Sequence, residues 1–190
     1  FYSIQGEGYH TGKAAYFIRI GEYDVGCHWC DIKESWDASV FPPVNVDEAV
    51  KNALQYKARS VVITGGEPLM YNLGFLCRQF KENDFLIFLE TSGSHGLTGS
   101  FDWICLSPKK NSPPLDALYP AADELKIIIE KELDFIWAEE HAEKVKKDCH
   151  LYLQPEWSKS KQMIPVIVDY IQNHPQWQIS LQSHKYMHIP

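Results

Sequence analysis

Two apolar stretches, each followed by small polar residues, decide the fold of this chain. Residues 60–68 read SVVITGGEP, and residues 85–93 read FLIFLETSG. Before their polar ends, neither stretch alternates apolar with polar side chains, which is typical of strands covered on both faces of a sheet. Such strands occur mainly in parallel sheets flanked by helices, so we expect an α/β fold.

The rest of the chain alternates strand-like and helix-like segments. Runs rich in β-branched and aromatic residues predict further strands at 14–20, 103–106, 125–129, 150–153 and 177–182. Helical spacing of apolar residues predicts helices at 46–54, 73–81, 132–146 and 163–173. Asn45 followed by Glu48 resembles a capping box, and Pro165 fits the last helix only in its first turn. The alternation predicts a mostly parallel sheet with crossover helices, and leaves open whether the sheet curls into part of a barrel.

Composition narrows the class of protein. The 190 residues, 45% of them hydrophobic and 23% charged, fit one globular domain spanning 1–190. A net charge of −7 argues against a surface for nucleic acid or anionic membranes. We see neither an apolar run of about 18–20 residues nor a secretory leader in FYSIQGEG. We therefore expect a cytoplasmic enzyme or binding domain with a small-molecule ligand.

The cysteines fall into two kinds. An odd number without a secretory leader does not suggest a disulfide framework; the five are Cys27, Cys30, Cys77, Cys105 and Cys149. Cys77 and Cys105 lie among apolar residues and are predicted to be small buried hydrophobes. Cys27 and Cys30, in CHWC, can converge on one metal ion or cluster, form a redox pair, or be incidental. His28 between them is badly placed to join them on one ion.

Polar loops follow several of the predicted strands. They are GGEP at 65–68, ETSG at 90–93, SPK at 107–109 and QPEW at 154–157, with QGEG at 5–8 before the first predicted strand. Each alone fits a plain loop, but ligands of parallel sheets bind at the carboxyl ends of the strands. Arg19, inside the apolar run YFIRI, indicates either a buried ion pair or an anionic ligand.

Taken in order, these motifs resemble the 7-carboxy-7-deazaguanine synthases, a family of radical S-adenosylmethionine enzymes on the route to queuosine. The resemblance covers essentially the whole chain and rests on QGEG, VGCHWCDIKESWD, GGEP, ETSG, SPK, QPE and HKY. It implies an abbreviated (β/α) partial barrel of the radical S-adenosylmethionine type. It also implies a homodimer and an external electron donor.

The resemblance implies the reaction as well. 6-Carboxy-5,6,7,8-tetrahydropterin would become 7-carboxy-7-deazaguanine with loss of ammonia. The reaction would start from a 5′-deoxyadenosyl radical made from S-adenosylmethionine at a [4Fe–4S] cluster. Cys27 and Cys30 match the second and third cysteines of the family's CxxxCxxC cluster motif.

Individual positions are carried over in the same way. The cofactor S-adenosylmethionine would contact Gly65, Gly66, Glu67, Pro68, Gly93, Ser107, Pro108, Lys109, Gln154, Pro155, Glu156 and Trp157. The pterin substrate would contact Ile4, Gln5, Gly6, Arg19, Thr91 and Pro190. Arg19 would face the substrate carboxylate with a bidentate fork, and the terminal carboxylate of Pro190 would reach into the substrate site.

Two positions depart from the family's pattern. Tyr23 stands where the first cluster cysteine is expected, four residues before Cys27. Ile32 stands where the family places a hydroxyl ligand of Mg²⁺, and its side chain has no oxygen to offer that ion.

Three hypotheses therefore stand. The chain is an active radical enzyme, a cluster-deficient homologue that binds pterin or S-adenosylmethionine without radical chemistry, or an unrelated thiol redox protein using CHWC.

Overall fold

One curved sheet organises the protein. The computed structural model describes residues 1–21 and 44–190, so Tyr23, Cys27, Cys30 and Ile32 lie outside the described residues. The strands of the sheet lie side by side in chain order: β1 (Tyr2–Ile4), β2 (Ala14–Ile20), β3 (Ser60–Gly65), β4 (Leu86–Thr91), β5 (Trp103–Leu106), β6 (Glu124–Ile129), β7 (His150–Pro155) and β8 (Trp177–Ile179). β1 pairs antiparallel with β2, and every later pairing is parallel. This confirms the predicted α/β fold with a mostly parallel sheet.

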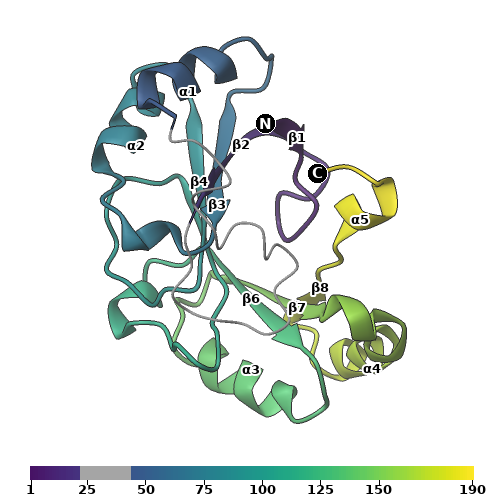
Figure 1. Cartoon of the computed structure of the whole chain (residues 1–190). Coiled ribbons are helices and arrows are strands. Elements are labelled where there is room, and N and C mark those ends of the chain that lie inside the picture. Colours follow the sequence, from purple (N-terminus) through teal and green to yellow (C-terminus); the bar gives the residue numbers. More distant parts are fainter. Residues whose placement is uncertain (22–43) are drawn as a thin grey trace.

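Helices surround the outside of the sheet (Figure 1). They are α1 (Val46–Ala53), α2 (Gly74–Lys81), α3 (Asp134–Ala142) and α4 (Ser160–Asn173), with the short α5 (Ser183–Met187) at the chain's end and single 3₁₀ turns η3 (Pro68–Met70), η4 (Asp116–Leu118) and η5 (Trp157–Lys159). The side chain of Asn45 caps α1 by accepting a hydrogen bond from the Asp47 amide at 2.9 Å, as predicted for a helix start. Within the described part of the chain, no helix is both long and apolar enough to span a bilayer.

One detail of the helix prediction was wrong. α4 begins at Ser160, immediately after η5, so Pro165 lies in the interior of the helix and not in its first turn. An interior proline removes one helical hydrogen bond and costs about 3 kcal/mol. Pro165 is exposed, while Met163 and Ile167 on the opposite face are 2% and 0% exposed. Burial of that apolar face holds the helix together despite the proline.

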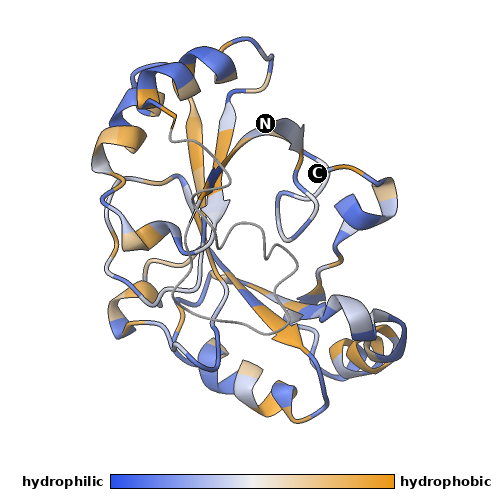
Figure 2. Cartoon of the chain, in the orientation of Figure 1, coloured by the Kyte–Doolittle hydropathy of each residue, from blue (hydrophilic) through white to orange (hydrophobic). Residues whose placement is uncertain are grey.

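The core lies between the sheet and the outer helices. In β3, Val61, Val62 and Ile63 are all buried, which confirms that both faces of this strand are covered. In β4 only the outward side chains are fully buried; Phe88 and Glu90, on the inner face, are half-buried. Figure 2 shows the strands of the sheet largely in the hydrophobic colour, with blue and orange alternating along the helices.

The sheet stays open between β1 and β8, and loops fill that gap. The Ser183 amide donates to the Gly6 carbonyl at 2.9 Å, and the Gly8 amide donates to Ser180 Oγ at 3.0 Å. Near the chain ends, Ser3 Oγ donates to the Pro190 carbonyl at 3.1 Å, and Figure 1 shows the two termini close together. The partial barrel is therefore closed by the loop after β1 and the C-terminal segment.

The loop after β1 also plugs the amino-terminal end of the barrel. The His10 ring stacks on Phe88 at 4.1 Å between centroids, and Tyr9 stacks on Trp103 at 4.4 Å. Burial, together with the nearby Lys13, lowers the pKa of His10 to about 4, so this ring is neutral at pH 7. An aromatic layer thus seals one end, and the polar residues of the inner face lie toward the other.

Candidate active site

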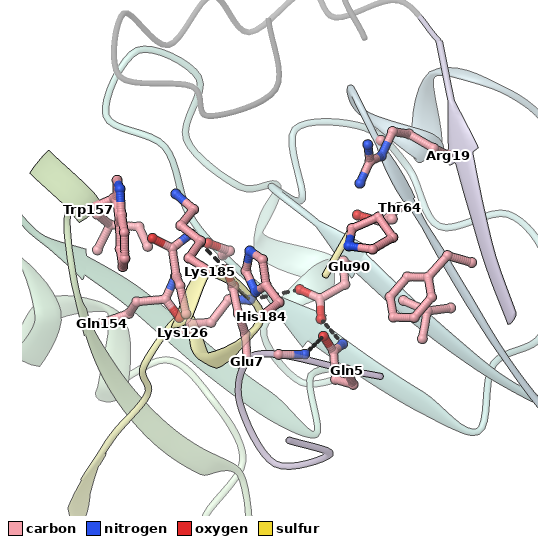
Figure 3. Close-up of a pocket in the computed structure, with 18 of the residues that line it drawn as sticks. Gln5, Glu7, Arg19, Thr64, Glu90, Lys126, Gln154, Trp157, His184 and Lys185 are labelled. Carbon is pink, nitrogen blue, oxygen red and sulfur yellow. Dashed lines mark hydrogen bonds and ion pairs between the residues drawn. The ribbon is translucent and has the colours of Figure 1, made fainter. Parts of the chain in front are cut away.

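A cavity of about 700 Å³ opens at the carboxyl ends of the parallel strands. Its size is within the range of pockets that enclose small ligands. In Figure 3, Arg19 and Thr64 stand at one side, Trp157 and Lys185 at the other, and Glu90 lies between them. The site residues predicted from the sequence that line this cavity are Ile4, Gln5, Gly6, Arg19, Gly65, Gly66, Glu67, Thr91, Ser107, Lys109, Gln154, Pro155, Glu156, Trp157 and Pro190.

Of the predicted residues that the structure describes, three do not line the cavity. Pro68, the last residue of GGEP, is buried and begins η3. Gly93 has φ +77°, and a Cβ there would come 2.5 Å from Leu106 Cδ1, so it lets the chain turn tightly over the core. Pro108 faces a separate small cavity beside Lys110 and Trp137.

The GGEP loop is locked to the neighbouring strand through its backbone. Gly65 has φ +129°, and a Cβ at this position would lie 2.1 Å from the Ile20 carbonyl oxygen. The Gly66 amide donates to the same oxygen at 2.9 Å. Only glycine at position 65 permits this approach, and both Gly65 and Gly66 line the cavity.

Glu67 is committed to the fold. Its carboxylate is 1% exposed and accepts from the Leu69 amide at 3.0 Å and the Thr91 hydroxyl at 2.5 Å. The Ser92 amide and hydroxyl donate to its other oxygen at 2.8 and 2.5 Å. The Thr91 hydroxyl in turn accepts from the Gly93 amide at 2.9 Å. Glu67 therefore ties the GGEP loop to the ETSG loop, and both of the other predicted groups, Thr91 and Gly93, belong to that tie.

The loops after β5 and β7 form the opposite wall. Lys109 Nζ donates to Ser107 Oγ at 2.9 Å. The carboxylate of Glu156 caps η5 by accepting from the Ser158 amide at 3.0 Å. Trp157 is 37% exposed; Lys185 Nζ lies 4.6 Å from its ring centroid. Cation–π contact therefore fastens the C-terminal helix α5 to this wall.

Arg19 is exposed, with its guanidinium carbon 5.2 Å from the centroid of the Phe1 ring. Of the two alternatives drawn from the sequence, the one that buries this charge is therefore wrong. Side chains alternate between the two faces of a strand, and this position of β2 points into the open mouth of the cavity. A guanidinium at a cavity wall is suited to an anionic ligand.

Comparison with known proteins places the chain in a family. It is 56% identical to 7-carboxy-7-deazaguanine synthase of Flavobacterium psychrophilum over 190 residues, covering 100% of this chain and 90% of the relative. It is 49% identical to the Synechocystis protein of the same name, with the same coverage. The chain belongs to the 7-carboxy-7-deazaguanine synthase family.

A solved structure agrees with this family. The crystal structure of QueE from Escherichia coli superposes with a TM-score of 0.83 at 29% identity, covering 97% of this chain and 92% of that one. The match confirms the predicted partial-barrel architecture. No protein-family model matches the chain.

Several pocket residues were not among the site residues predicted from the sequence, although Glu7, Glu90 and His184 lie within the motifs QGEG, ETSG and HKY. Glu7, Thr64, Glu90, Lys126 and His184 all line the cavity. Lys126 is 4% exposed and lies within the run ELKIII of β6. A charge inside an apolar strand is the signal that had drawn attention to Arg19, and the same signal could have found Lys126.

None of the described cysteines lines the cavity. Cys77, Cys105 and Cys149 are buried and unpaired by disulfides, as predicted for the first two. Burial raises the pKa of each thiol, to about 12 for Cys149. In the part of the chain that the structure describes, none of these thiols offers a ready replacement for the cysteine expected at Tyr23.

Proposed function

We propose that this chain is a radical S-adenosylmethionine lyase that converts 6-carboxy-5,6,7,8-tetrahydropterin to 7-carboxy-7-deazaguanine with loss of ammonia, a step toward queuosine. The observation that carries the proposal is a polar cavity with an arginine at one wall and carboxylates at its floor, in a member of the 7-carboxy-7-deazaguanine synthase family. That distribution of charge matches a ligand with a carboxylate at one end and N–H donors at the other.

The substrate end of the proposal follows from hydrogen-bonding chemistry. The planar guanidinium of Arg19 can bind a carboxylate with two parallel hydrogen bonds. The carboxylates of Glu7 and Glu90 can only accept when ionised, so they suit the N–H groups of a 2-amino-4-oxo-pteridine ring. Pro190 also lines the cavity.

The proposed cofactors are a [4Fe–4S] cluster and S-adenosylmethionine, which when bound supply the radical that starts the reaction. The cavity fits the cofactor's amino-acid end, because Gly65 and Gly66 line it and leave room for its polar groups. Cys27 and Cys30 provide thiolates of the type that iron clusters require. Tyr23 stands where the remaining cysteine ligand of the cluster is expected, so the experiments below test whether a cluster forms without it.

The protein's own contribution is to bind, orient and exclude water. The aromatic plug of Tyr9 and His10 seals the amino-terminal end of the barrel. The segment around α5 covers the gap between β1 and β8, and the side chains of His184 and Lys185 line the cavity. A cavity that is closed at this end and along this gap helps to protect a reactive intermediate from solvent.

Anaerobic reconstitution with iron and sulfide tests the proposal. We expect four irons per chain, an electron paramagnetic resonance signal that shifts with S-adenosylmethionine, and formation of the deazapurine with release of ammonia. A chain lacking both thiols, Cys27→Ala with Cys30→Ala, is the control and should hold no cluster.

A Tyr23→Cys variant separates the remaining hypotheses. If the natural chain holds little iron but Tyr23→Cys restores the cluster and product formation, the natural chain is a cluster-deficient homologue. If neither forms a cluster while both bind the pterin, the radical activity is excluded for this chain. A disulfide between Cys27 and Cys30 without iron would instead support thiol redox chemistry.

The homodimer and the external electron donor stay predictions from the family resemblance, and the cytoplasmic location stays a prediction from the sequence. Mg²⁺ does too, and Ile32 offers it no ligand oxygen. One continuous sheet along the described residues supports the prediction of a single domain at 1–190.

A further inference from the structure

One buried lysine lies beneath the pocket between two carboxylates. Lys126 Nζ is 2.6 Å from Glu7 Oε2 and 2.9 Å from Glu90 Oε2, and the lysine side chain is 5% exposed (Figure 3). The three residues come from the loop after β1, from β4 and from β6. Their meeting point therefore depends on the curvature of the whole sheet.

In each of the two carboxylates, one oxygen pairs with Lys126 and the other accepts a hydrogen bond from a glutamine side chain. Glu7 Oε1 accepts from Gln182 Nε2 at 2.9 Å, and Glu90 Oε1 accepts from Gln5 Nε2 at 3.0 Å. Lys126 thus stands at the centre of a chain that runs from Gln182 through both carboxylates to Gln5. The chain fixes the orientation of both carboxylates at the cavity floor.

The charges explain why a cation is needed there. Two carboxylates held close together in a buried site do not both ionise without a positive charge, and one of them takes up a proton. Burial alone would raise the pKa of Glu7, but the Lys126 ammonium, together with hydrogen bonds from Gln182 and Gln154, lowers the pKa to about 2. The Cys105 thiol on β5 and Glu124 on β6 also face Lys126.

Glu124 is a third acidic side chain near Lys126. Burial, with the negative charge of Glu90, raises the pKa of Glu124 to about 7. Its carboxylate accepts from Trp103 Nε1 at 3.0 Å and from the Tyr9 amide at 3.2 Å. Three acidic side chains therefore surround one ammonium group.

We propose that Lys126 is a positioning residue: it keeps Glu7 and Glu90 ionised and side by side, so that both accept hydrogen bonds from the N–H edge of a bound pteridine. The inference rests on the proposed function, because it takes the pteridine as the ligand. Without the lysine, the two glutamates would share one proton, and one of the acceptors would become a donor. That donor would then face an N–H donor of the ligand.

Calorimetric titration of the reconstituted chain with pterin-6-carboxylate, an unreactive oxidised analogue, tests this at several pH values from 6 to 9. We expect Lys126→Met to bind about tenfold or more weakly at pH 6, with the deficit shrinking as pH rises and the shared proton leaves. The ratio of the variant's Kd to that of the natural chain isolates the protein, because the ligand's own ionisation is common to both.

Two further variants sharpen the test. Lys126→Arg retains the charge, so its Kd ratio should stay flat with pH even if its affinity changes. Lys81→Met on the outer helix α2, which removes the ion pair between Lys81 and Asp102, is the control and should match the natural chain. If Lys126→Met does not fold, Lys126→Gln keeps N–H donors while removing the charge, and it must show the same pH-dependent loss.

The outcomes separate the two proposals. If the natural chain fails to bind pterin-6-carboxylate, the proposed substrate class is wrong and the inference falls with it. If the natural chain binds but the neutral Lys126 variants behave like Lys81→Met, or if Lys126→Arg shows the same pH-dependent loss as they do, the inference alone is overturned.

Discussion

Replacing Glu67 by glutamine tests whether the carboxylate of the GGEP loop serves the fold. One terminal oxygen of Glu67 faces the Leu69 amide, and the other faces the Ser92 amide. In Glu67→Gln, one of these oxygens becomes an NH₂ group, so one backbone N–H must face another donor. The hydroxyls of Thr91 and Ser92 can rotate and accept instead, but the amides cannot.

The magnitude follows from that geometry. A hydrogen bond to a charged group contributes about 1.5–3 kcal/mol, and a buried unsatisfied N–H costs about 1–3 kcal/mol. Glu67 is 1% exposed, so water cannot replace the lost partner. We expect Glu67→Gln to lose about 3–5 kcal/mol of unfolding free energy. At about 2–4 °C per kcal/mol for a chain of this size, Tm should fall by roughly 6–20 °C.

Urea unfolding followed by circular dichroism, with thermal melts, measures the effect. The control is Glu48→Gln in the first turn of α1, where the side chain is exposed and the expected change is within about 0.5 kcal/mol. An unfolding free energy within about 1 kcal/mol of the natural chain would refute the reasoning. Weaker binding of S-adenosylmethionine without any loss of stability would show instead that Glu67 acts on the ligand.

Three further predictions rest on single residues. The folded pKa of Glu124, about 7, exceeds the 4.5 of the free side chain, so its contribution to stability is lost as pH rises through that interval. From pH 4.5 to 8, the unfolding free energy of Glu124→Gln should therefore rise by about 3 kcal/mol relative to that of the natural chain, as measured by urea unfolding. An equal pH dependence of the two proteins would contradict this. Gly65→Ala should lose at least about 2 kcal/mol of unfolding free energy and weaken S-adenosylmethionine binding, because the new Cβ overlaps a backbone oxygen. Gly12→Ala is the control: Gly12 has φ +87° and nothing within 4 Å of a Cβ, so this variant measures the backbone strain alone. Equal losses of stability in the two variants would rule out the overlap as the cause. Arg19→Met should weaken binding of pterin-6-carboxylate about tenfold or more but leave pterin without the carboxylate unaffected, and equal losses in calorimetry would show that Arg19 does not read the carboxylate.

Much of the fold was open to prediction, because apolar runs and their polar ends are local features. The strands at 14–20 and 103–106 match β2 and β5 residue for residue. β1 and α5 went unpredicted, since three and five residues carry too little periodicity to be recognised. The interior position of Pro165 shows the limit of local rules, because burial of Met163 and Ile167 outweighs the cost of the proline.

For the candidate site too, some features could be predicted from local sequence and others depend on tertiary contacts. GGEP, ETSG and QPEW could be gathered at one end of the sheet from the sequence, because the carboxyl ends of successive parallel strands must share an edge. The role of Glu67 could not, since its donors in the ETSG loop lie 24 and 25 residues away and are found only once β3 and β4 pair. Arg19 was singled out from the sequence and lines the cavity, but its exposure depended on which face of β2 lines the cavity.

The amino-acid sequence by itself determined the order of strands and helices, the end of the sheet where polar groups collect, and the family to which the chain belongs. Only the tertiary structure decided which charges meet. Lys126 pairs with Glu90, 36 residues away, and with Glu7, 119 residues away. No local pattern links these positions: strand register and the curvature of the sheet bring them together, and a buried ammonium is stable only where carboxylates surround it.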